Sequence, residues 1–531
     1  MLSVSYFVIF FLFCLQISVK DNPIFRCLSG YSLKISGKNS LGSYSSSSVL
    51  VIPLFSIFSS PSITPLTSLT MLCSLRPLPY GPRFSYQVIR LLSTAVQTME
   101  INGARYKTVP GVTNATPTIL KHVGKNLHLK PNHPVNILRE LIENKLNSVD
   151  NAFTTYNNYP PVVTVFENFD SLGFPRDHPG RSKSDTYYIN NEYLLRTHTS
   201  AHEMECYSKL ESDPKRSGFL ISADVYRRDE IDRTHYPVFH QMEGCRIWRR
   251  GPNMLEQIRS DLATLEAALD KEDLKLVVTD ESRMCTPENP KQSYMTYEEV
   301  DLVSRHLKRS IELIICEVFN KKIESLSDPL ASKELKVRWI DAYFPWTTPS
   351  WEIEVWWGDE WLELCGCGVV QQQVLLNAEY PEDSTVSWAF GLGLDRIAML
   401  LFEIPDIRLL WTQDERFTSQ FKDGTITSFK PYSKYPGTKR DMAFWLPEGQ
   451  SADNSVIHDN DVMEIVRGVA GDLVESVKLI DRFMNKKLNR TSLCYRINYQ
   501  SMDRNVTNSE VNALQAQVEK ELVHKYHVEI R

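Results

Sequence analysis

Two arginine-containing stretches concentrate polar residues within otherwise apolar strands and could present them to a ligand. Arg227 lies in ADVYRRDEIDRTHYPVFHQMEG (223–244), where two predicted strands flank a charged loop. Arg396 follows the glycines of SWAFGLGLDRIAML (387–400), at the start of a predicted helix. The planar guanidinium group of arginine binds phosphate through two parallel hydrogen bonds. Taken alone, the first stretch is also typical of a solvated loop, and the second of a tight turn.

Further polar residues lie near Arg227 in the sequence. The return strand VFHQMEG carries Gln241 and Glu243, and a hairpin can present Arg227 and Glu243 on one sheet face. Another polar stretch, LLRTHTSAHE, places His198 and His202 four residues apart, as on one helix face. Zinc binding would require further ligands at a recognisable spacing, and the sequence supplies none.

The elements that must position these residues form two folded units. Three segments have helical spacing of apolar residues: 133–149, 254–274 and 296–320. Four runs have the character of strands: 162–169, 218–226, 350–357 and 359–370. Adjacent strands of this kind favour an antiparallel sheet flanked by helices, an α+β fold.

The last hundred residues predict a second, smaller unit. DMAFWL is a predicted strand, NDVMEIVRGVA a helix, and VESVKLIDRFM and SLCYRINYQSM a hairpin. Thr507 and Glu510 form a capping box before a second helix, and HVEIR closes the chain as a strand. This βαββαβ order is the ferredoxin-like plan.

Composition excludes several classes of protein. Of 531 residues, 42% are hydrophobic and 23% charged, which excludes collagen-like and wholly disordered chains. The formal net charge of -6 excludes a basic coat over the whole chain, although a local basic face stays possible. The ten cysteines form no CxxC pair, which favours a reducing compartment over a disulfide framework.

The N-terminal segment differs from the rest of the chain. Residues 1–99 contain seven Lys or Arg and one acid, Asp21. The apolar start, residues 1–19, suggests a secretory signal, but no basic residue precedes Lys20. The stretch after Met71 is cationic and free of acids up to Glu100, as in organelle presequences. We expect an organelle presequence, with secretion as the alternative.

Several strings together resemble class II aminoacyl-tRNA synthetases. VYRRD, VFHQMEG and GLGLDRIAML are similar to motifs 2 and 3 of that class. ENFDSLGFPRDHPGR, LLRTHTSAH, FPWTTPSWEIEV and WLELCGCGV resemble the phenylalanyl-tRNA synthetase family. The segment that begins PYSKYPGTKRDMAFWL is similar to that family's ferredoxin-fold anticodon-binding domain. A catalytic unit fused to this domain on one chain is the monomeric, mitochondrial type, located in the matrix.

The resemblance implies ATP-dependent activation of L-phenylalanine to Phe-AMP, followed by transfer to tRNA(Phe), without membrane association. Arg227 would bind the α-phosphate and the attacked carboxylate, and Arg396 the terminal phosphate. Gln241 and Glu243 would hold the substrate ammonium group. The other implied substrate-site residues are Ser200, Ala201, His202, Glu203, Thr234, His235, Tyr236, Met242 and Glu363. ATP implies Mg²⁺, for which Glu363 is a candidate ligand.

The implied pocket for the phenylalanine ring is aromatic. Phe344, Trp346 and Phe390 would form its walls and Ala389 its floor, although such residues also suit an ordinary buried core. The family usually has Phe where this chain has Trp346, which leaves the shape of the pocket open.

The implied tRNA contacts lie in the C-terminal unit. A cationic hairpin turn is suited to phosphate or to solvent; its residues are Arg482, Lys486, Lys487 and Arg490. Three aromatic residues are candidates for stacking on anticodon bases: Tyr432, Tyr435 and Phe444.

The expected organisation has four segments. They are an extension with presequence (1–98), a catalytic domain (99–412), a linker (413–432) and an anticodon-binding domain (433–531). A non-catalytic RNA-binding relative is the alternative function, but both phosphate arginines and the ammonium acceptors are present. A synthetase for another amino acid, such as histidine, is disfavoured by the apolar pocket.

Overall fold

The computed structural model describes residues 97–325, 333–421, 425–431, 435–448, 457–486 and 488–531. The chain divides into two units, Met1–Ser93 and Thr94–Arg531, and the described residues belong to the second. The presequence expected after Met71 and the candidates Tyr432 and Lys487 lie outside the described residues.

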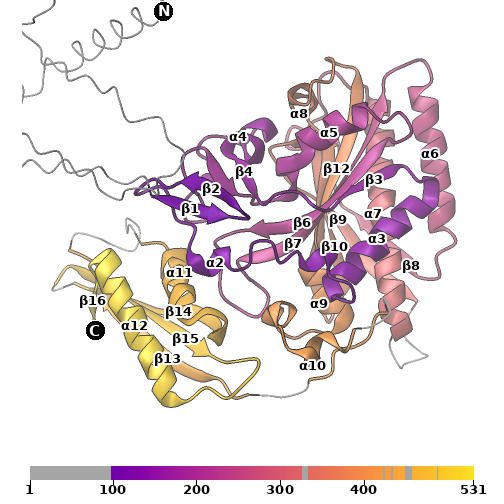
Figure 1. The fold of residues 1–531 in the computed structure, drawn as a ribbon. Coiled ribbons are helices and arrows are strands. Elements are labelled where there is room, and N and C mark those ends of the chain that lie inside the picture. Colours follow the sequence, from indigo (N-terminus) through magenta and orange to yellow (C-terminus); the bar gives the residue numbers. More distant parts are fainter. Residues whose placement is uncertain (1–96, 326–332, 422–424, 432–434, 449–456, 487) are drawn as a thin grey trace, which may run out of the picture. The chain divides into compact units, whose positions relative to one another are not determined.

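An eight-stranded sheet forms the centre of the larger part of the described chain, which precedes the C-terminal part (Figure 1). Its strands, in spatial order, are β3 (Phe153–Tyr156), β6 (Gly218–Tyr226), β7 (Val238–Arg249), β12 (Thr385–Gly393), β11 (Glu360–Val370), β10 (Thr347–Trp357), β9 (Glu334–Asp341) and β8 (Lys275–Asp280). Neighbouring strands are antiparallel except at the two edges, where β3 pairs with β6 and β8 with β9 in parallel. The predicted antiparallel sheet flanked by helices is therefore confirmed, with parallel edge strands added.

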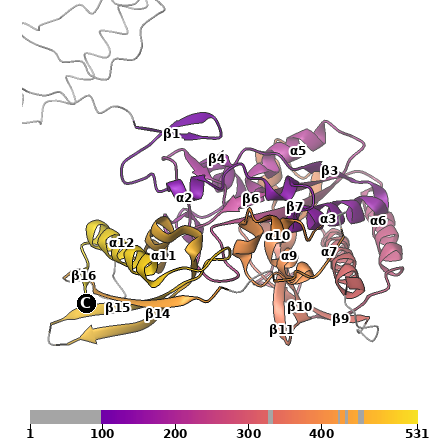
Figure 2. The ribbon, with the colours of Figure 1, turned by 60° about the horizontal axis from the view of Figure 1, so that its bottom comes forward.

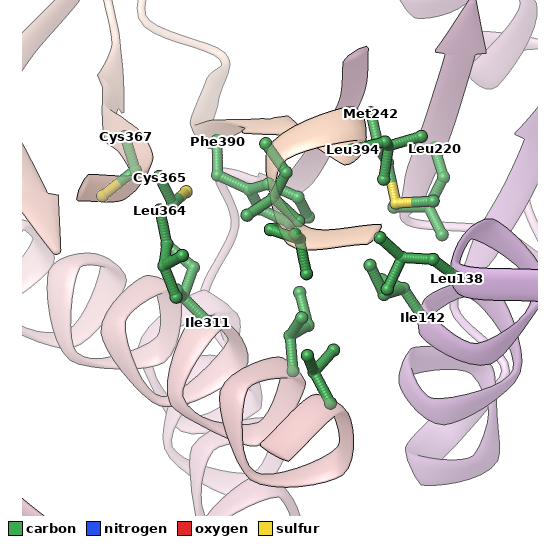
Figure 3. Close-up of a cluster of buried hydrophobic side chains, with 14 of the residues drawn as sticks. Leu138, Ile142, Leu220, Met242, Ile311, Leu364, Cys365, Cys367, Phe390 and Leu394 are labelled. Carbon is green, nitrogen blue, oxygen red and sulfur yellow. The ribbon is translucent and has the colours of Figure 1, made fainter. Parts of the chain in front are cut away.

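Alternation along the strands divides the side chains between two faces. Leu220, Met242 and Phe390 belong to the main hydrophobic core, whereas Ile221 and Ala389 belong to a smaller core on the opposite face. Helices α3 (Pro134–Asp150), α7 (Tyr297–Ser325) and α9 (Leu394–Phe402) contribute to the main core (Figure 3). Helices α5 (Glu203–Glu211) and α8 (Gln372–Asn377) cover the smaller core, and α6 (Met254–Leu269) packs against α7.

Capping contacts explain where two of the helices begin. At α7, the N–H of Glu299 donates to the Thr296 hydroxyl, and its carboxylate accepts from the N–H of Thr296. The same pairing of Thr164 with Glu167 shows that the predicted strand 162–169 was wrong in its second half. There the chain forms β4 (Val162–Thr164) and then α4 (Val165–Asn168), because the capping box starts a helix.

The C-terminal part has the predicted βαββαβ order. Its elements are β13 (Thr438–Trp445), α11 (Asp459–Ala470), β14 (Val474–Asn485), β15 (Arg490–Tyr499), α12 (Asn508–Tyr526) and β16 (Glu529–Ile530). The sheet order is β14-β15-β13-β16, and all its pairings are antiparallel. Figure 2 shows α11 and α12 on one side of this sheet. The ferredoxin-like prediction is confirmed.

Shorter elements complete the described part of the chain. They are the hairpin β1 (Thr98–Ile101) and β2 (Ala104–Lys107), helices α2 (Pro117–Leu120) and α10 (Glu415–Thr418), and β5 (Tyr193–Leu195), which pairs with β4. Among the described residues, no helix is both long enough and apolar enough to cross a membrane.

Candidate active site

A cavity of about 880 Å³ lies where β7, β11 and β12 meet the charged loop between β6 and β7. It brings together most of the residues expected from the sequence. These are Ser200, Glu203, Arg227, Thr234, His235, Tyr236, Gln241, Glu243, Phe344, Trp346, Glu363, Ala389, Phe390 and Arg396. The volume is in the usual range for binding sites of small molecules.

Three expected residues lie outside the lining of this cavity. Met242 is between Gln241 and Glu243 on β7, so strand alternation turns it into the main core. Ala201 packs in the smaller core. The His202 ring stacks on Tyr159, with 4.4 Å between ring centroids, and burial lowers its pKa well below the usual value. These three positions therefore support the site from behind its walls.

One end of the cavity is built to receive a positive charge. Glu243 is buried on β7, and one of its carboxylate oxygens accepts hydrogen bonds from the hydroxyls of Ser200 (2.5 Å) and Thr199 (3.0 Å). The turn Thr199–His202 that carries these hydroxyls leads directly into α5. Gln241 lies two residues before Glu243 on the same face, and its side-chain oxygen is 3.4 Å from the N–H of Thr199.

A second end of the cavity carries two arginines. The Nε of Arg227 donates to the carbonyl oxygen of Thr197 (2.8 Å), and its guanidinium carbon lies 5.2 Å from the Phe239 ring centroid. Arg396 is in the first turn of α9, next to Asp395, whose buried carboxylate accepts from the N–H of His240. The hydrogen bond to Thr197 orients the side chain of Arg227, and the contact between Asp395 and His240 fixes the first turn of α9, which carries Arg396.

The third part of the lining is aromatic. Trp346 stacks on Phe174 with 5.1 Å between ring centroids, and Phe344 lies 5.7 Å from Trp346. Ala389 is on the cavity face of β12, as expected for a floor residue. Phe390 borders the cavity as well, but successive residues of a strand face opposite ways. The ring of Phe390 lies in the main core, as Figure 3 shows. It stacks on Trp388, with 5.8 Å between the ring centroids.

His198 is a cavity residue to which sequence reasoning gave no substrate role. It is 6% exposed, and its ring stacks 5.6 Å from Phe174 and 5.7 Å from Trp346. Burial and the positive charge of Arg227 lower its pKa to about 3, so the ring is neutral at physiological pH. Its place directly before Thr199 and Ser200 was the signal available in the sequence.

The charged loop that follows Arg227 is held by the C-terminal part of the chain. The carbonyl oxygen of Arg228 accepts from Asn460 (2.9 Å), and that of Asp229 from Arg467 (2.8 Å). The carbonyl oxygen of Ile231 accepts from the N–H of Val477 (2.9 Å). The Ile231 side chain itself belongs to the hydrophobic core of the C-terminal part. Residues more than 200 positions away in the sequence thus position this loop. The sequence alone did not reveal these contacts.

The sheet of the C-terminal part carries a cluster of aromatic and cationic side chains near its hairpin. Trp445 and Phe483 are 6.1 Å apart, and the guanidinium carbon of Arg531 lies 5.4 Å from the first ring and 5.5 Å from the second. Arg490 lies 5.6 Å from Trp445 and forms an ion pair with Glu529.

The other expected tRNA contacts of the C-terminal part have mixed outcomes. Arg482 and Lys486 are both exposed, and Arg490 is half-buried. Phe444, expected to stack on a base, is instead fully buried, because its position on β13 faces the helices. Tyr435 is half-buried, and its carbonyl oxygen accepts from Gln500.

Comparison with known proteins identifies the class. A family described as "tRNA synthetases class II core domain (F)" matches residues 120–269 and 298–421. A family described as "Ferredoxin-fold anticodon binding domain" matches residues 433–531. The fold and the cavity are thus those of a class II aminoacyl-tRNA synthetase. Enzymes of this class use ATP and a divalent metal ion.

Individual relatives narrow the assignment. The mitochondrial phenylalanine–tRNA ligase of Saccharomyces cerevisiae is 64% identical over 83% of this chain and 97% of that protein. The mitochondrial ligase of Dictyostelium discoideum is 40% identical over 80% of this chain and 90% of its own length. The mouse mitochondrial ligase is 41% identical over 79% of this chain and 86% of its own length. The chain belongs to the phenylalanine–tRNA ligase family.

Proposed function

We propose that this chain attaches L-phenylalanine to tRNA(Phe) in the mitochondrial matrix and acts as a monomer. The observation that carries the activity is the single cavity that joins an acidic end, two arginines and an aromatic pocket. The monomeric state is supported by the presence of catalytic and anticodon-binding parts on one chain. The location is supported by the cationic segment after Met71 and by the mitochondrial relatives.

In the first step, a carboxylate oxygen of phenylalanine attacks the α-phosphorus of ATP. A new O–P bond forms, the bond to the β-phosphate oxygen breaks, and pyrophosphate leaves with the electron pair. Arg227 would bind the α-phosphate and the carboxylate, and Arg396 the terminal phosphate. Both stabilise negative charge through fixed donors, which is the main task of a protein in such a transfer.

The substrate is oriented by the other two parts of the cavity. Glu243 offers a negative charge to the ammonium group, and Gln241 and Ser200 supply polar atoms beside it. Phe344, Trp346 and Ala389 would surround the phenyl ring. Fixing both ends of the amino acid brings its carboxylate toward Arg227 and lowers the entropic cost of the reaction.

One carboxylate of the cavity lining, Glu363, lies near Arg227 and is suited to a divalent cation. Glu363 is exposed at the cavity, and the pKa of Glu352 is raised by burial and then by the negative charges of Glu363 and Glu354. Oxygen ligands whose charges repel one another suit Mg²⁺, which arrives with ATP. Glu363 would hold the ion, and the ion would neutralise part of the phosphate charge.

In the second step, a ribose hydroxyl at the end of the tRNA takes the phenylalanyl group and AMP leaves. The C-terminal sheet would identify the tRNA through its anticodon. Trp445 and Phe483 offer ring faces to unpaired bases, and Arg531 and Arg490 supply positive charge beside them.

Pyrophosphate exchange into ATP, measured separately with each amino acid, tests this function. We expect exchange that depends on phenylalanine and is much weaker with tyrosine, histidine or leucine. Aminoacylation of tRNA(Phe) by the same preparation should follow. Exchange with another amino acid alone, or no exchange in a folded protein that binds tRNA, would contradict the proposal.

A further inference from the structure

Two buried glutamates lie side by side at the acidic end of the cavity. Glu203, the first residue of α5, is 0% exposed, and Glu243 on β7 is 3% exposed. Carboxylate oxygens of both and the Sγ of Cys245 lie within 4.8 Å of one another. Two adjacent negative charges in such a buried place would be very unfavourable.

The hydrogen bonds of the pair leave one oxygen of each carboxylate unmatched. One oxygen of Glu243 accepts from Ser200 and Thr199, and one oxygen of Glu203 accepts from the Cys245 thiol at 3.7 Å. Among the described residues, no N–H or hydroxyl donor reaches Oε1 of Glu243 or Oε2 of Glu203. A single proton placed between the two carboxylates would satisfy both oxygens and remove one charge.

The surroundings determine which glutamate carries the proton. Burial, and then the charge of Glu243, raises the pKa of Glu203 well above its usual value. Burial also raises the pKa of Glu243, but hydrogen bonds from Glu203, Ser200 and Thr199 oppose that rise. The anionic form is therefore better supported on Glu243.

Within the described part of the chain, no cationic side chain contributes to the electrostatics of Glu203 or Glu243. Cys245 on β7 and Cys206 and Tyr207 on α5 are the other titratable groups beside the pair. Burial raises the pKa of each, so all three are neutral at physiological pH. The negative charge of Glu243 is thus the one that faces Glu203.

We propose that Glu203 is a positioning residue that stays protonated and donates a hydrogen bond from its carboxyl O–H to Glu243. The acidic end then carries one negative charge, held on Glu243 at a fixed orientation and matched to a single substrate ammonium group. Glu203 acts through Glu243 rather than on the substrate. This inference rests on the proposed function, in which that end of the cavity binds the amino group of phenylalanine.

Two substitutions separate this role from that of a second anionic ligand. Glu203→Leu removes the donor, and we expect the KM for phenylalanine in pyrophosphate exchange to rise by about 10-fold or more, the cost of a lost hydrogen bond to a charged group. The KM for ATP should stay nearly constant. Glu203→Gln can donate an amide N–H, and it should recover most of this loss. Glu205→Gln, on the exposed side of the same helix, is the matched control.

Two results of these substitutions would contradict the proposed role of Glu203. Loss of phenylalanine binding in Glu203→Gln as severe as in Glu243→Gln would show that Glu203 must be charged, and would overturn the proposal. An unaltered KM for phenylalanine in a folded Glu203→Leu protein would also overturn it.

Infrared difference spectroscopy tests the proton itself. The wild-type protein at neutral pH should show the carbonyl band of a buried protonated carboxylic acid, and Glu203→Gln should lack it. Absence of this band from the wild type would overturn the proposal even if Glu203→Leu failed to fold. Because this measurement needs no turnover, it is independent of the exchange assay, whose failure in the wild type would instead contradict the proposed function.

Discussion

The side chain of Asn460, on the C-terminal α11, donates a hydrogen bond of 2.9 Å to the carbonyl oxygen of Arg228. Arg228 directly follows Arg227, the residue assigned to the α-phosphate. The same amide group of Asn460 lies 3.3 Å from the carbonyl oxygen of Ser184. One side chain of the anticodon-binding part therefore fixes two loops at the rim of the catalytic cavity.

This contact makes adenylate formation sensitive to a residue far from the chemistry. Asn460→Ala should raise the KM for ATP in pyrophosphate exchange without tRNA by about 3-fold to 10-fold, because a backbone acceptor beside Arg227 loses its donor. Asn512→Ala, on the exposed surface of α12, should leave the KM unchanged. If the KM for ATP were the same in Asn460→Ala and Asn512→Ala, the loop would keep its position without Asn460.

The two arginines that we assign to phosphate binding, Arg227 and Arg396, should both be needed for the first step. Arg227→Ala and Arg396→Ala should each reduce the rate of pyrophosphate exchange by about 10² or more, because each removes a donor to developing negative charge. Arg249→Ala, which breaks an exposed ion pair with Glu211, is the matched control. Circular dichroism should show the fold intact in all three. Near-normal exchange in either of the first two variants would contradict the assigned role.

Buried histidines should make stability depend on pH. Burial lowers the pKa of His133 to about 4 and that of His128 to about 3. Unfolded histidine binds a proton near pH 6.5, so the unfolded state takes up more protons as the pH falls below that value. The free energy of unfolding should therefore fall from pH 7 toward pH 4, by at most about 1.4 kcal/mol per pH unit for each histidine.

His133 has a specific reason to resist protonation. Its Nδ1 accepts from the N–H of Val135 at the start of α3, and its Nε2 lies 2.9 Å from the carbonyl oxygen of Leu410. A proton on Nδ1 would break the first contact. Urea unfolding at several pH values gives the free energy of unfolding as a function of pH. This free energy should fall less steeply with decreasing pH in His133→Gln than in the wild type, whereas the exposed His524→Gln should match the wild type. An identical pH dependence of the unfolding free energy in all three proteins would show that His133 does not contribute to it.

The aromatic cluster near the C-terminal hairpin should contribute to tRNA binding alone. Trp445→Ala should raise the KM for tRNA(Phe) in aminoacylation by about 10-fold, the usual cost of losing one stacked base. Pyrophosphate exchange without tRNA should not change. Val523→Ala on α12, exposed on the helical side of the domain, serves as the control. A change in exchange, or none in the KM for tRNA, would place the anticodon contact elsewhere.

Local patterns predicted the elements and the polar ends of the cavity. The strand that ends just before Arg227 and the strand that carries Gln241 and Glu243 were visible because apolar runs flank a charged loop there. The helix at 165–168 was missed because its apolar residues continue a strand-like run, although Thr164 and Glu167 signalled its start.

What the sequence could not supply depends on contacts between distant segments. Strand direction decides which of two neighbours faces a cavity, and so Ala389 and Phe390 were assigned to the same pocket although their side chains point to opposite sheet faces. The contacts of Asn460 and Ile231 join segments separated by more than 200 residues. Periodicity within a single element carries no information about them.

The floor residue Ala389 should set the size limit of the pocket. It lines the cavity from β12, where it pairs with Gly368 on β11 and with Cys245 on β7. The described aromatic walls are apolar, and an apolar pocket discriminates against an added hydroxyl by only about 10². Removal of the Ala389 methyl group should weaken this steric discrimination further.

Ala389→Gly should therefore admit phenylalanines that carry a chlorine or a hydroxyl in the para position. Pyrophosphate exchange would compare kcat/KM for phenylalanine with that for each analogue, and the preference for phenylalanine should fall by about 10-fold, the value of one methyl-sized space. Ala378→Gly is a matched control, because Ala378 is buried in the same smaller core but does not line the cavity. Ala389→Val should have the opposite effect and reduce the activation of phenylalanine itself. If Ala389→Gly and Ala378→Gly changed the preference equally, looser packing of the core rather than the floor of the pocket would be responsible.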